Sequence, residues 1–171
     1  AQVKNKDAPR ILDICCGTGS VVLTFDERYP QSVAIGYDFS PGMLRKAREK
    51  NSTGRGIFVE GDAADLPFAD DCFDVVTCSH ALYELKGQIR HKALHEMQRV
   101  VHTDGYVLLM EHEIPRHPVV RLLFYIRMLS MGSKDAREFM RGGVDHLQNI
   151  FARVTLSHSR SGKSKLMCCR K

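Results

Sequence analysis

The sequence predicts an α/β fold, a three-layer sandwich in which helices cover both faces of a mostly parallel, seven-stranded sheet. Short apolar runs alternate with longer segments of helical periodicity along most of the chain. Right-handed crossovers place the helices of such a chain on the two faces of a parallel sheet. The last two apolar runs flank one glycine-containing turn, which predicts a C-terminal antiparallel hairpin.

The first half of the chain has a β-α-β-α-β pattern. Pro30 ends the first predicted helix, because proline cannot continue a helix. Ser40 and Pro41 supply a cap and a favourable first residue for the second helix. The predicted elements are strands over 10–15, 32–38 and 56–60 and helices over 19–29 and 43–50.

The alternation continues into the second half. A continuous apolar run predicts a buried fourth strand, and Asp104 and Gly105 predict a turn before the fifth. These elements are strands over 73–79 and 106–110 and a helix over 88–101. We then expect an apolar helical segment over 118–131, a polar one over 134–140, a short helix over 144–150, and hairpin strands over 151–159 and 166–170.

Composition indicates one domain over residues 1–171. The chain has 171 residues, of which 43% are hydrophobic, and this is enough to form one core. We find no internal repeat or linker in the sequence. Its net charge of +5 is a mild basic excess that does not require nucleic acid. We expect a reducing cytoplasm, since the six cysteines do not resemble a disulfide framework and the polar start has no signal-peptide pattern. Only Cys72, in a polar loop, is expected to react readily.

Glycines follow the first strand in the segment Asp13-Ile14-Cys15-Cys16-Gly17-Thr18-Gly19. Glycine allows a tight turn with positive φ, and the helix amides that follow attract anionic groups. The same segment also fits a strand-to-helix turn that binds nothing.

Acidic residues follow the next two strands. Asp38 ends the second strand, where a carboxylate can accept both hydrogens of a ribose diol or can cap the helix that starts at Ser40. Asp62 follows the third strand, close to the apolar residues Leu66 and Phe68. Because parallel strands end at one edge of a sheet, we expect a ligand site there.

These segments together resemble the class I S-adenosylmethionine (SAM) dependent methyltransferases, within them the ubiquinone/menaquinone-biosynthesis-like branch. ILDICCGTGS is similar to the family's glycine motif and GYDFSPGMLRKAR to its acidic motif. GDAADLPFADDCFDVVTCSHAL and LHEMQRVVHTDGYVLLME are similar to its third-strand to fifth-strand block. The resemblance covers about 10–113; Cys15 replaces the commoner glycine, and the tail over 114–171 is only loosely similar.

The resemblance implies a Rossmann-like fold, SAM as cofactor and S-adenosylhomocysteine (SAH) as product. It places Asp13, Cys15, Gly17 and Gly19 around the methionine part of SAM, with Cys16, Thr18 and Ser40 in the same loops. It gives Asp38 the ribose, Phe39 and Met43 the adenine ring, and Asp62 and Ala63 the adenine edge. Ser79 and His80 would lie under the sulfonium. The candidate catalytic residues are His80, Tyr83 and His112, and no metal site is expected.

The expected activity is methyl transfer to a small, largely apolar acceptor. A dinucleotide-dependent oxidoreductase would need a third glycine where this chain has Val22. RNA methylation stays an alternative, although Ser79-His80-Ala81-Leu82 lacks the motif of amino-directed relatives and we expect no nucleic-acid partner. A non-catalytic SAM-binding or interaction module also stays open, because little chain precedes the first strand.

Three groups of residues carry competing interpretations. The apolar segment 118–131 fits a helix packed on the sheet, an acceptor lid, or a peripheral contact with a membrane. His91 and His95 fit a metal-binding pair or, more simply, a surface pair. His112, Glu113 and His117 follow the fifth strand, where acceptor binding or base catalysis is expected.

Overall fold

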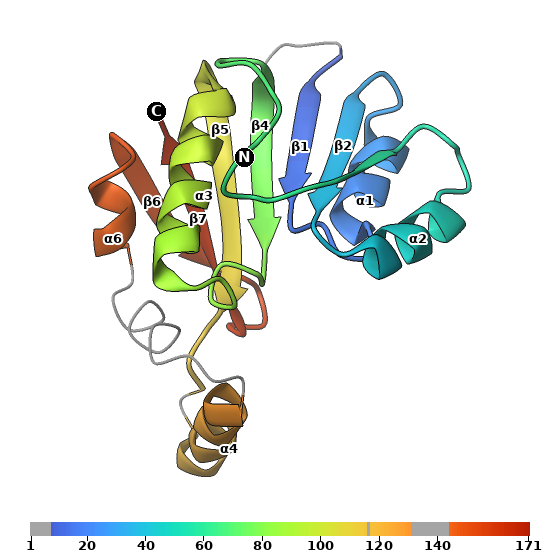
Figure 1. Cartoon of the computed structure of the whole chain (residues 1–171). Coiled ribbons are helices and arrows are strands. Elements are labelled where there is room, and N and C mark those ends of the chain that lie inside the picture. The colour runs from blue at the N-terminus through green and yellow to red at the C-terminus, as the bar shows by residue number, and fades with distance from the viewer. Residues whose placement is uncertain (1–7, 116, 131–143) are drawn as a thin grey trace.

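A seven-stranded sheet with the order β3-β2-β1-β4-β5-β7-β6 forms the centre of the protein (Figure 1). The computed structural model describes residues 8–115, 117–130 and 144–171. Strands β1 to β5 run parallel, and β7 runs antiparallel to β5 and β6, which confirms the predicted fold class. The strands are β1 Arg10–Ile14, β2 Val33–Asp38, β3 Ile57–Glu60, β4 Phe73–Ser79, β5 Val101–His112, β6 Arg153–His158 and β7 Ser164–Arg170.

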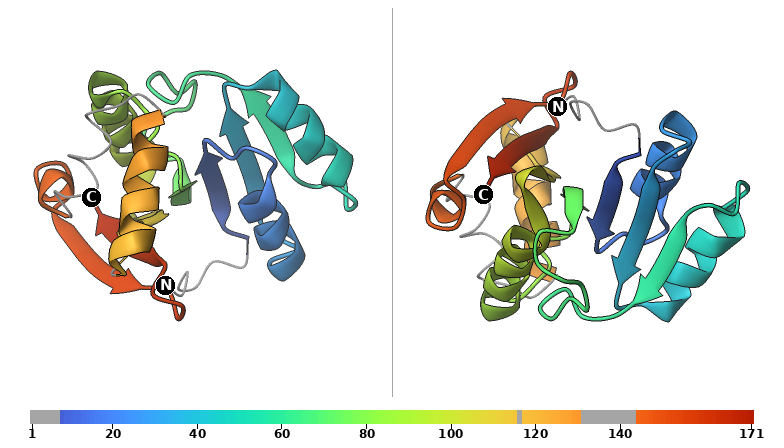
Figure 2. Two further views of the ribbon diagram at one scale, coloured as in Figure 1. Left: turned by 90° about the horizontal axis from the view of Figure 1, so that it is seen from below. Right: turned by 90° about the horizontal axis from the view of Figure 1, so that it is seen from above.

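Helices cover both faces of the sheet (Figure 2). Alternate residues of one strand enter different cores: Ile11 packs with residues of α1 and α2, whereas Leu12 packs with residues of α3. This burial of apolar area on both faces is the main force that holds the three layers together. The helices are α1 Ser20–Arg28, α2 Pro41–Lys50, α3 Gly87–Val100, α4 Pro118–Ser130 and α6 Asp145–Gln148.

The turn predicted at Asp104 and Gly105 is wrong, because both residues lie inside β5. The register between β4 and β5 shifts there, so that Val101 pairs with Phe73 but Tyr106 pairs with Val75. A Cβ on Gly105 would lie 2.7 Å from the backbone oxygen of Asp74, so glycine allows the bulge to sit against β4. The helix predicted over 134–140 lies outside the described residues.

The apolar segment after β5 forms α4, but the interpretation of it as a helix packed on the sheet is wrong. Figure 1 shows α4 beyond the end of the sheet. Among the α4 side chains that the structure describes, Phe124 alone packs against the main core. Its other large apolar side chains that the structure describes are 50–61% exposed, namely Val119, Val120, Leu122, Leu123 and Ile126. Within the described ranges no helix is long and apolar enough to cross a membrane.

The cysteines are free thiols, and Cys16, Cys78 and Cys169 are buried. Burial raises the pKa of Cys169 to about 12 and also raises the pKa of Cys16. The structure does not support the expectation that Cys72 reacts readily. Its side chain is half-buried against the main core, and burial raises its pKa above the ordinary thiol value.

We therefore expect Cys72 to react slowly with thiol reagents in the native protein, because a raised pKa lowers the fraction of reactive thiolate at neutral pH. Timed thiol counting before and after denaturation measures this, with Cys72→Ser as the control that identifies its signal. A fast native-state reaction that disappears in Cys72→Ser would contradict the assignment.

Candidate functional site

The loop between β1 and α1 turns sharply, because three of its residues have positive φ. The φ values are 55° at Cys15, 53° at Gly17 and 76° at Gly19. A Cβ on Gly19 would lie 2.7 Å from the Phe58 ring, so glycine is needed there for both space and conformation. A Cβ on Gly17 would meet no atom within 4 Å, so only its backbone conformation favours glycine.

The Asp38 carboxylate joins this loop to the end of β2. Its Oδ2 accepts the backbone N–H of Gly17 at 2.8 Å, and its Oδ1 accepts the backbone N–H of Ser40 at 2.9 Å. The side chain that caps α2 belongs to Ser40, whose Oγ accepts the N–H of Met43 at 3.4 Å. Asp38 is therefore buried at the meeting point of two loops and is not itself the helix cap.

Asp13 supports the glycine loop from within the sheet. Its Oδ1 accepts the hydroxyl of Thr77 on β4 at 2.5 Å, and its side chain is completely buried. Burial raises the pKa of Asp13 to about 7; the Thr77 hydrogen bond opposes this shift and the nearby Asp38 charge adds to it. A carboxyl with this pKa is partly protonated at neutral pH.

An apolar platform lies beside Asp38. Phe39 is 75% exposed directly after β2, and Met43 in the first turn of α2 is 43% exposed. Asp62 follows the neighbouring strand β3, is exposed, and accepts the N–H of Ala64 at 2.9 Å, while Ala63 is buried. Exposed apolar side chains next to a carboxylate provide a surface for a flat ring with polar edges.

The predicted catalytic residues gather where β4 and β5 end. The rings of His80 and His112 stack with centroids 4.1 Å apart, and the Tyr83 ring lies 5.7 Å from His112. His80 has a φ of 54° and donates its backbone N–H to the oxygen of Met110. Burial lowers the pKa of His80, so its imidazole is neutral at neutral pH and can accept a proton.

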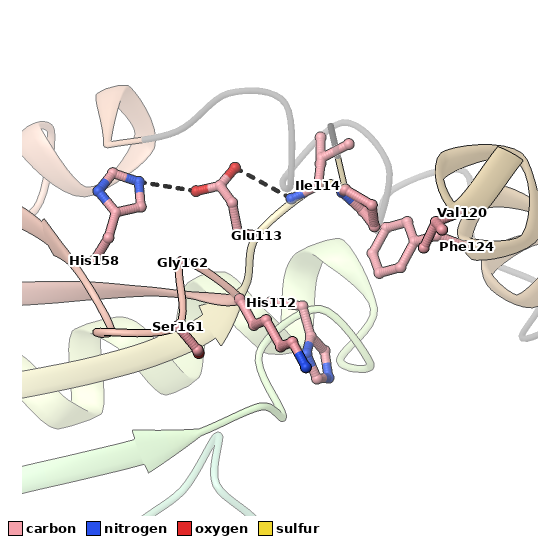
Figure 3. Close-up of a pocket in the computed structure, with 10 residues that line it drawn as sticks. His112, Glu113, Ile114, Val120, Phe124, His158, Ser161 and Gly162 are labelled. Atoms are coloured by element: carbon pink, nitrogen blue, oxygen red, sulfur yellow. Dashed lines mark hydrogen bonds and ion pairs between the residues drawn. The ribbon is translucent and has the colours of Figure 1, made fainter. Parts of the chain in front are cut away.

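A cavity of about 880 Å³ opens beside His112 (Figure 3). One part of its wall is apolar, and there α4 brings Val120 and Phe124 to the cavity. On another part His158 donates from Nε2 to Oε2 of Glu113 at 3.0 Å. The lining residues are His112, Glu113, Ile114, Pro115, Val120, Phe124, His158, Ser161, Gly162 and Lys163.

Sequence reasoning missed the contribution of the hairpin to this cavity. Ser164 at the start of β7 pairs with His112 at the end of β5. The turn before β7 must therefore return to the carboxyl edge of the parallel strands, where it lines the cavity together with His158. The predicted hairpin was the signal that could have revealed this, because the turn before a strand that runs antiparallel to the fifth strand lies at this edge of the sheet.

The remaining histidines lie apart from this arrangement. His91 and His95 are exposed neighbours on α3, with ring centroids 4.5 Å apart, and the described residues contain no group of three or more metal-binding side chains. His117 precedes α4 and is not among the residues that line the cavity.

Comparison with known proteins gives a consistent result. The family model for a methyltransferase domain matches residues 11–105. A demethylmenaquinone methyltransferase of Roseiflexus sp. (strain RS-1) is 38% identical over 112 residues, which are 66% of this chain and 46% of that protein. A ubiquinone/menaquinone biosynthesis C-methyltransferase of Citrifermentans bemidjiense is 33% identical over 137 residues, 77% of this chain and 57% of that protein. This chain thus spans about half the length of these relatives.

Solved structures agree on the fold. The structure of PigF with SAH superposes with a TM-score of 0.75 at 20% sequence identity, and the match covers 95% of this chain and 50% of that one. At this level of identity the likeness shows the fold alone.

Gly19→Ala should destabilise the protein more than Gly17→Ala, because only the Cβ at position 19 meets the Phe58 ring. We expect a loss of about 2–4 kcal/mol in the free energy of unfolding for Gly19→Ala, against about 1 kcal/mol for Gly17→Ala, where only the positive φ opposes alanine. Urea unfolding measures both, and Phe58→Leu should recover part of the loss at position 19. Equal losses at the two glycines would show that the Phe58 contact is unimportant.

Proposed function

Because the chain belongs to the methyltransferase-domain family, we propose that it transfers a methyl group from SAM to a small, largely apolar acceptor. The relatives that are 33% and 38% identical confirm the predicted resemblance to the ubiquinone/menaquinone branch. The observation that carries the proposal is the meeting of two half-sites at one edge of the sheet. The glycine loop with Asp38 forms one half, and the cavity beside His112 forms the other.

The first half-site has the groups that a nucleoside with an amino-acid tail requires. Each oxygen of Asp38 accepts one backbone N–H, so each keeps a lone pair for a ribose hydroxyl. Phe39 and Met43 provide an apolar face for adenine, with Asp62 and Ala63 at its edge. The remaining contacts that we propose lie at the ends of β1 and β4 and in the loops after β1, β2 and β4, at Asp13, Cys15, Cys16, Gly17, Thr18, Gly19, Ser40, Ser79 and His80.

The second half-site has to align the acceptor and take up its proton. When bound, SAM supplies a methyl group on a cationic sulfur, so the protein contributes mainly orientation and exclusion of water. His80 and His112 lie at the ends of β4 and β5, and the lowered pKa of His80 leaves it able to accept a proton from a hydroxyl or an activated carbon of the acceptor. Tyr83 lies beside the same pair and narrows this region.

The cavity wall indicates the acceptor class. Ile114, Pro115, Val120 and Phe124 favour an apolar body, and the Glu113–His158 pair favours a polar group on it. The exposed apolar face of α4 carries Arg121 and lies next to the cavity, which supports delivery of the acceptor from a lipid surface. Within the described part of the chain, the apolar wall of the cavity favours such an acceptor over RNA.

Asp38→Ala should weaken SAH binding at least about tenfold, because it removes charge-assisted hydrogen bonds to the ribose. The variant also loses the acceptors for the N–H groups of Gly17 and Ser40, so its stability should fall. Isothermal titration calorimetry with SAH measures the affinity. Asp26→Ala removes another buried carboxylate, on α1 against Arg55, and serves as the control that loses stability but binds SAH normally. A folded Asp38→Ala protein with wild-type affinity would disprove the assignment.

Turnover should be confined to apolar acceptors in a panel of quinol precursors, small hydrophobic metabolites and RNA. Val120→Asp places a charge in the cavity wall and should raise KM for such an acceptor at least about tenfold. Leu123→Asp, on the exposed face of α4, should leave turnover of dissolved acceptors unchanged and reduce turnover of acceptors held in vesicles. Activity on RNA alone, or a Val120→Asp enzyme of wild-type KM, would refute the apolar pocket.

A further inference from the structure

Two buried ionisable side chains hold the backbone of Leu82, in the loop between β4 and α3. Oε1 of Glu111 on β5 accepts the N–H of Leu82 at 3.0 Å. Nη1 of Arg90 on α3 donates to the carbonyl oxygen of Leu82 at 3.4 Å. Glu111 is 1% exposed and Arg90 is 7% exposed, while the Leu82 side chain is fully buried. A loop residue is thus fixed on both its backbone groups from two different elements.

Burial of these two side chains is unfavourable for the free energy of folding. Burial disfavours the charged forms of a carboxyl and a guanidinium, and apolar residues of similar size often stabilise such a position better. Desolvation raises the pKa of Glu111 to about 8; the Leu82 N–H, Lys165 and Arg90 oppose the shift, and Glu84 adds to it. Oε2 of Glu111 has no hydrogen-bond partner among the described residues. The contacts of Glu111 and Arg90 with the Leu82 backbone point to a role in fixing its conformation.

The residues whose positions depend on Leu82 lie at the acceptor side of the site. Leu82 comes two residues after His80, whose φ of 54° needs support from its surroundings, and one residue before Tyr83. His80 stacks on His112, and His112 follows Glu111 directly on β5 and lines the cavity. Any movement of Leu82 is therefore transmitted to both His80 and Tyr83.

We propose that Glu111 and Arg90 are positioning residues that hold Leu82 and thereby set His80 and Tyr83 against His112 at the acceptor cavity. The catalytic consequence rests on the proposed methyl transfer, whereas the positioning itself does not. Neither residue touches the acceptor; each acts through the loop.

Glu111 also gives the loop a pH dependence. The charged or titratable groups that face it are Arg90 on α3, Lys165 on β7, Cys78 on β4 and Glu84 in the loop. Its folded-state pKa lies above the unfolded value, so the stability that this group contributes is complete below the unfolded pKa and is lost as pH rises through about 8. The protonated acid is the form that burial favours, and the loop is expected to loosen on the alkaline side.

Glu111→Met and Glu111→Gln separate positioning from stability. Methionine matches the volume of glutamate without accepting the Leu82 N–H, whereas glutamine keeps an acceptor and cannot ionise. In Glu111→Met we expect kcat to fall at least about tenfold, SAH affinity to stay within about twofold, and the imidazole NMR signals of His80 and His112 to shift. Glu111→Gln should restore kcat and both signals near neutral pH and abolish the alkaline decline in activity of the wild-type enzyme.

Two further variants keep the test decisive. If Glu111→Met fails to fold, variants of Arg90 provide the test. Arg90→Gln retains a donor for the Leu82 carbonyl, so it should shift the imidazole signals of His80 and His112 less than Arg90→Met does. Asp26→Asn, a buried acid in α1 far from this loop in sequence, should leave kcat and both signals unchanged. A folded Glu111→Met protein with wild-type kcat and unshifted imidazole signals would overturn the inference. Absence of methyl transfer by the wild-type protein would refute the proposed function instead, and the imidazole signals would still decide the positioning role.

Discussion

The site depends on one carboxylate, that of Asp38, which accepts a backbone N–H from each of two loops. The glycine loop after β1 has three residues with positive φ, and a hydrogen bond from Gly17 to a neighbouring element helps to keep it in one conformation. β2 supplies the acceptor of this hydrogen bond because it lies next to β1 and ends at the same edge of the sheet. The half-site that we propose for the cofactor is therefore held by contacts within the protein, an arrangement that lowers the ordering cost of binding.

Buried acids serve different purposes in the two half-sites. Asp13 supports the sheet end through Thr77, while Glu111 supports the β4–α3 loop through Leu82. Burial raises the pKa of both carboxyls, to about 7 and about 8, so each is stable in its buried place largely because it can stay protonated. The matched methyltransferase domain, residues 11–105, contains the first of these supports but not the second. The residues that line the acceptor cavity, from His112 onward, lie beyond this match, whereas His80, Tyr83 and Leu82 lie within it.

The sequence predicted the fold, which the structure confirms, and a candidate site at one edge of the sheet, where the structure brings Gly17 and Asp38 into contact. Strand ends in a parallel sheet meet at one edge, so Gly17, Asp38 and Asp62 could be placed together from their positions alone. The packing of α4 could not be predicted, since helical periodicity shows that Leu122 and Ile126 share an apolar character but not what covers them. Two further features depend on contacts between elements that are distant in the sequence, which no local pattern records. These are the partial burial of Cys72 and the hydrogen bonds of Glu111 and Arg90 with the Leu82 backbone.

The most direct test of the two half-sites is an NMR titration of the wild-type protein with SAH that follows the backbone amides. We predict saturable binding of one SAH per chain, with the largest shifts at Gly17, Phe39 and Ser40 around the Asp38 carboxylate, and small shifts at the cavity residues His158 and Lys163. Absence of saturable binding, or shifts concentrated at the cavity while Gly17 and Ser40 stay unchanged, would contradict the placement of the cofactor.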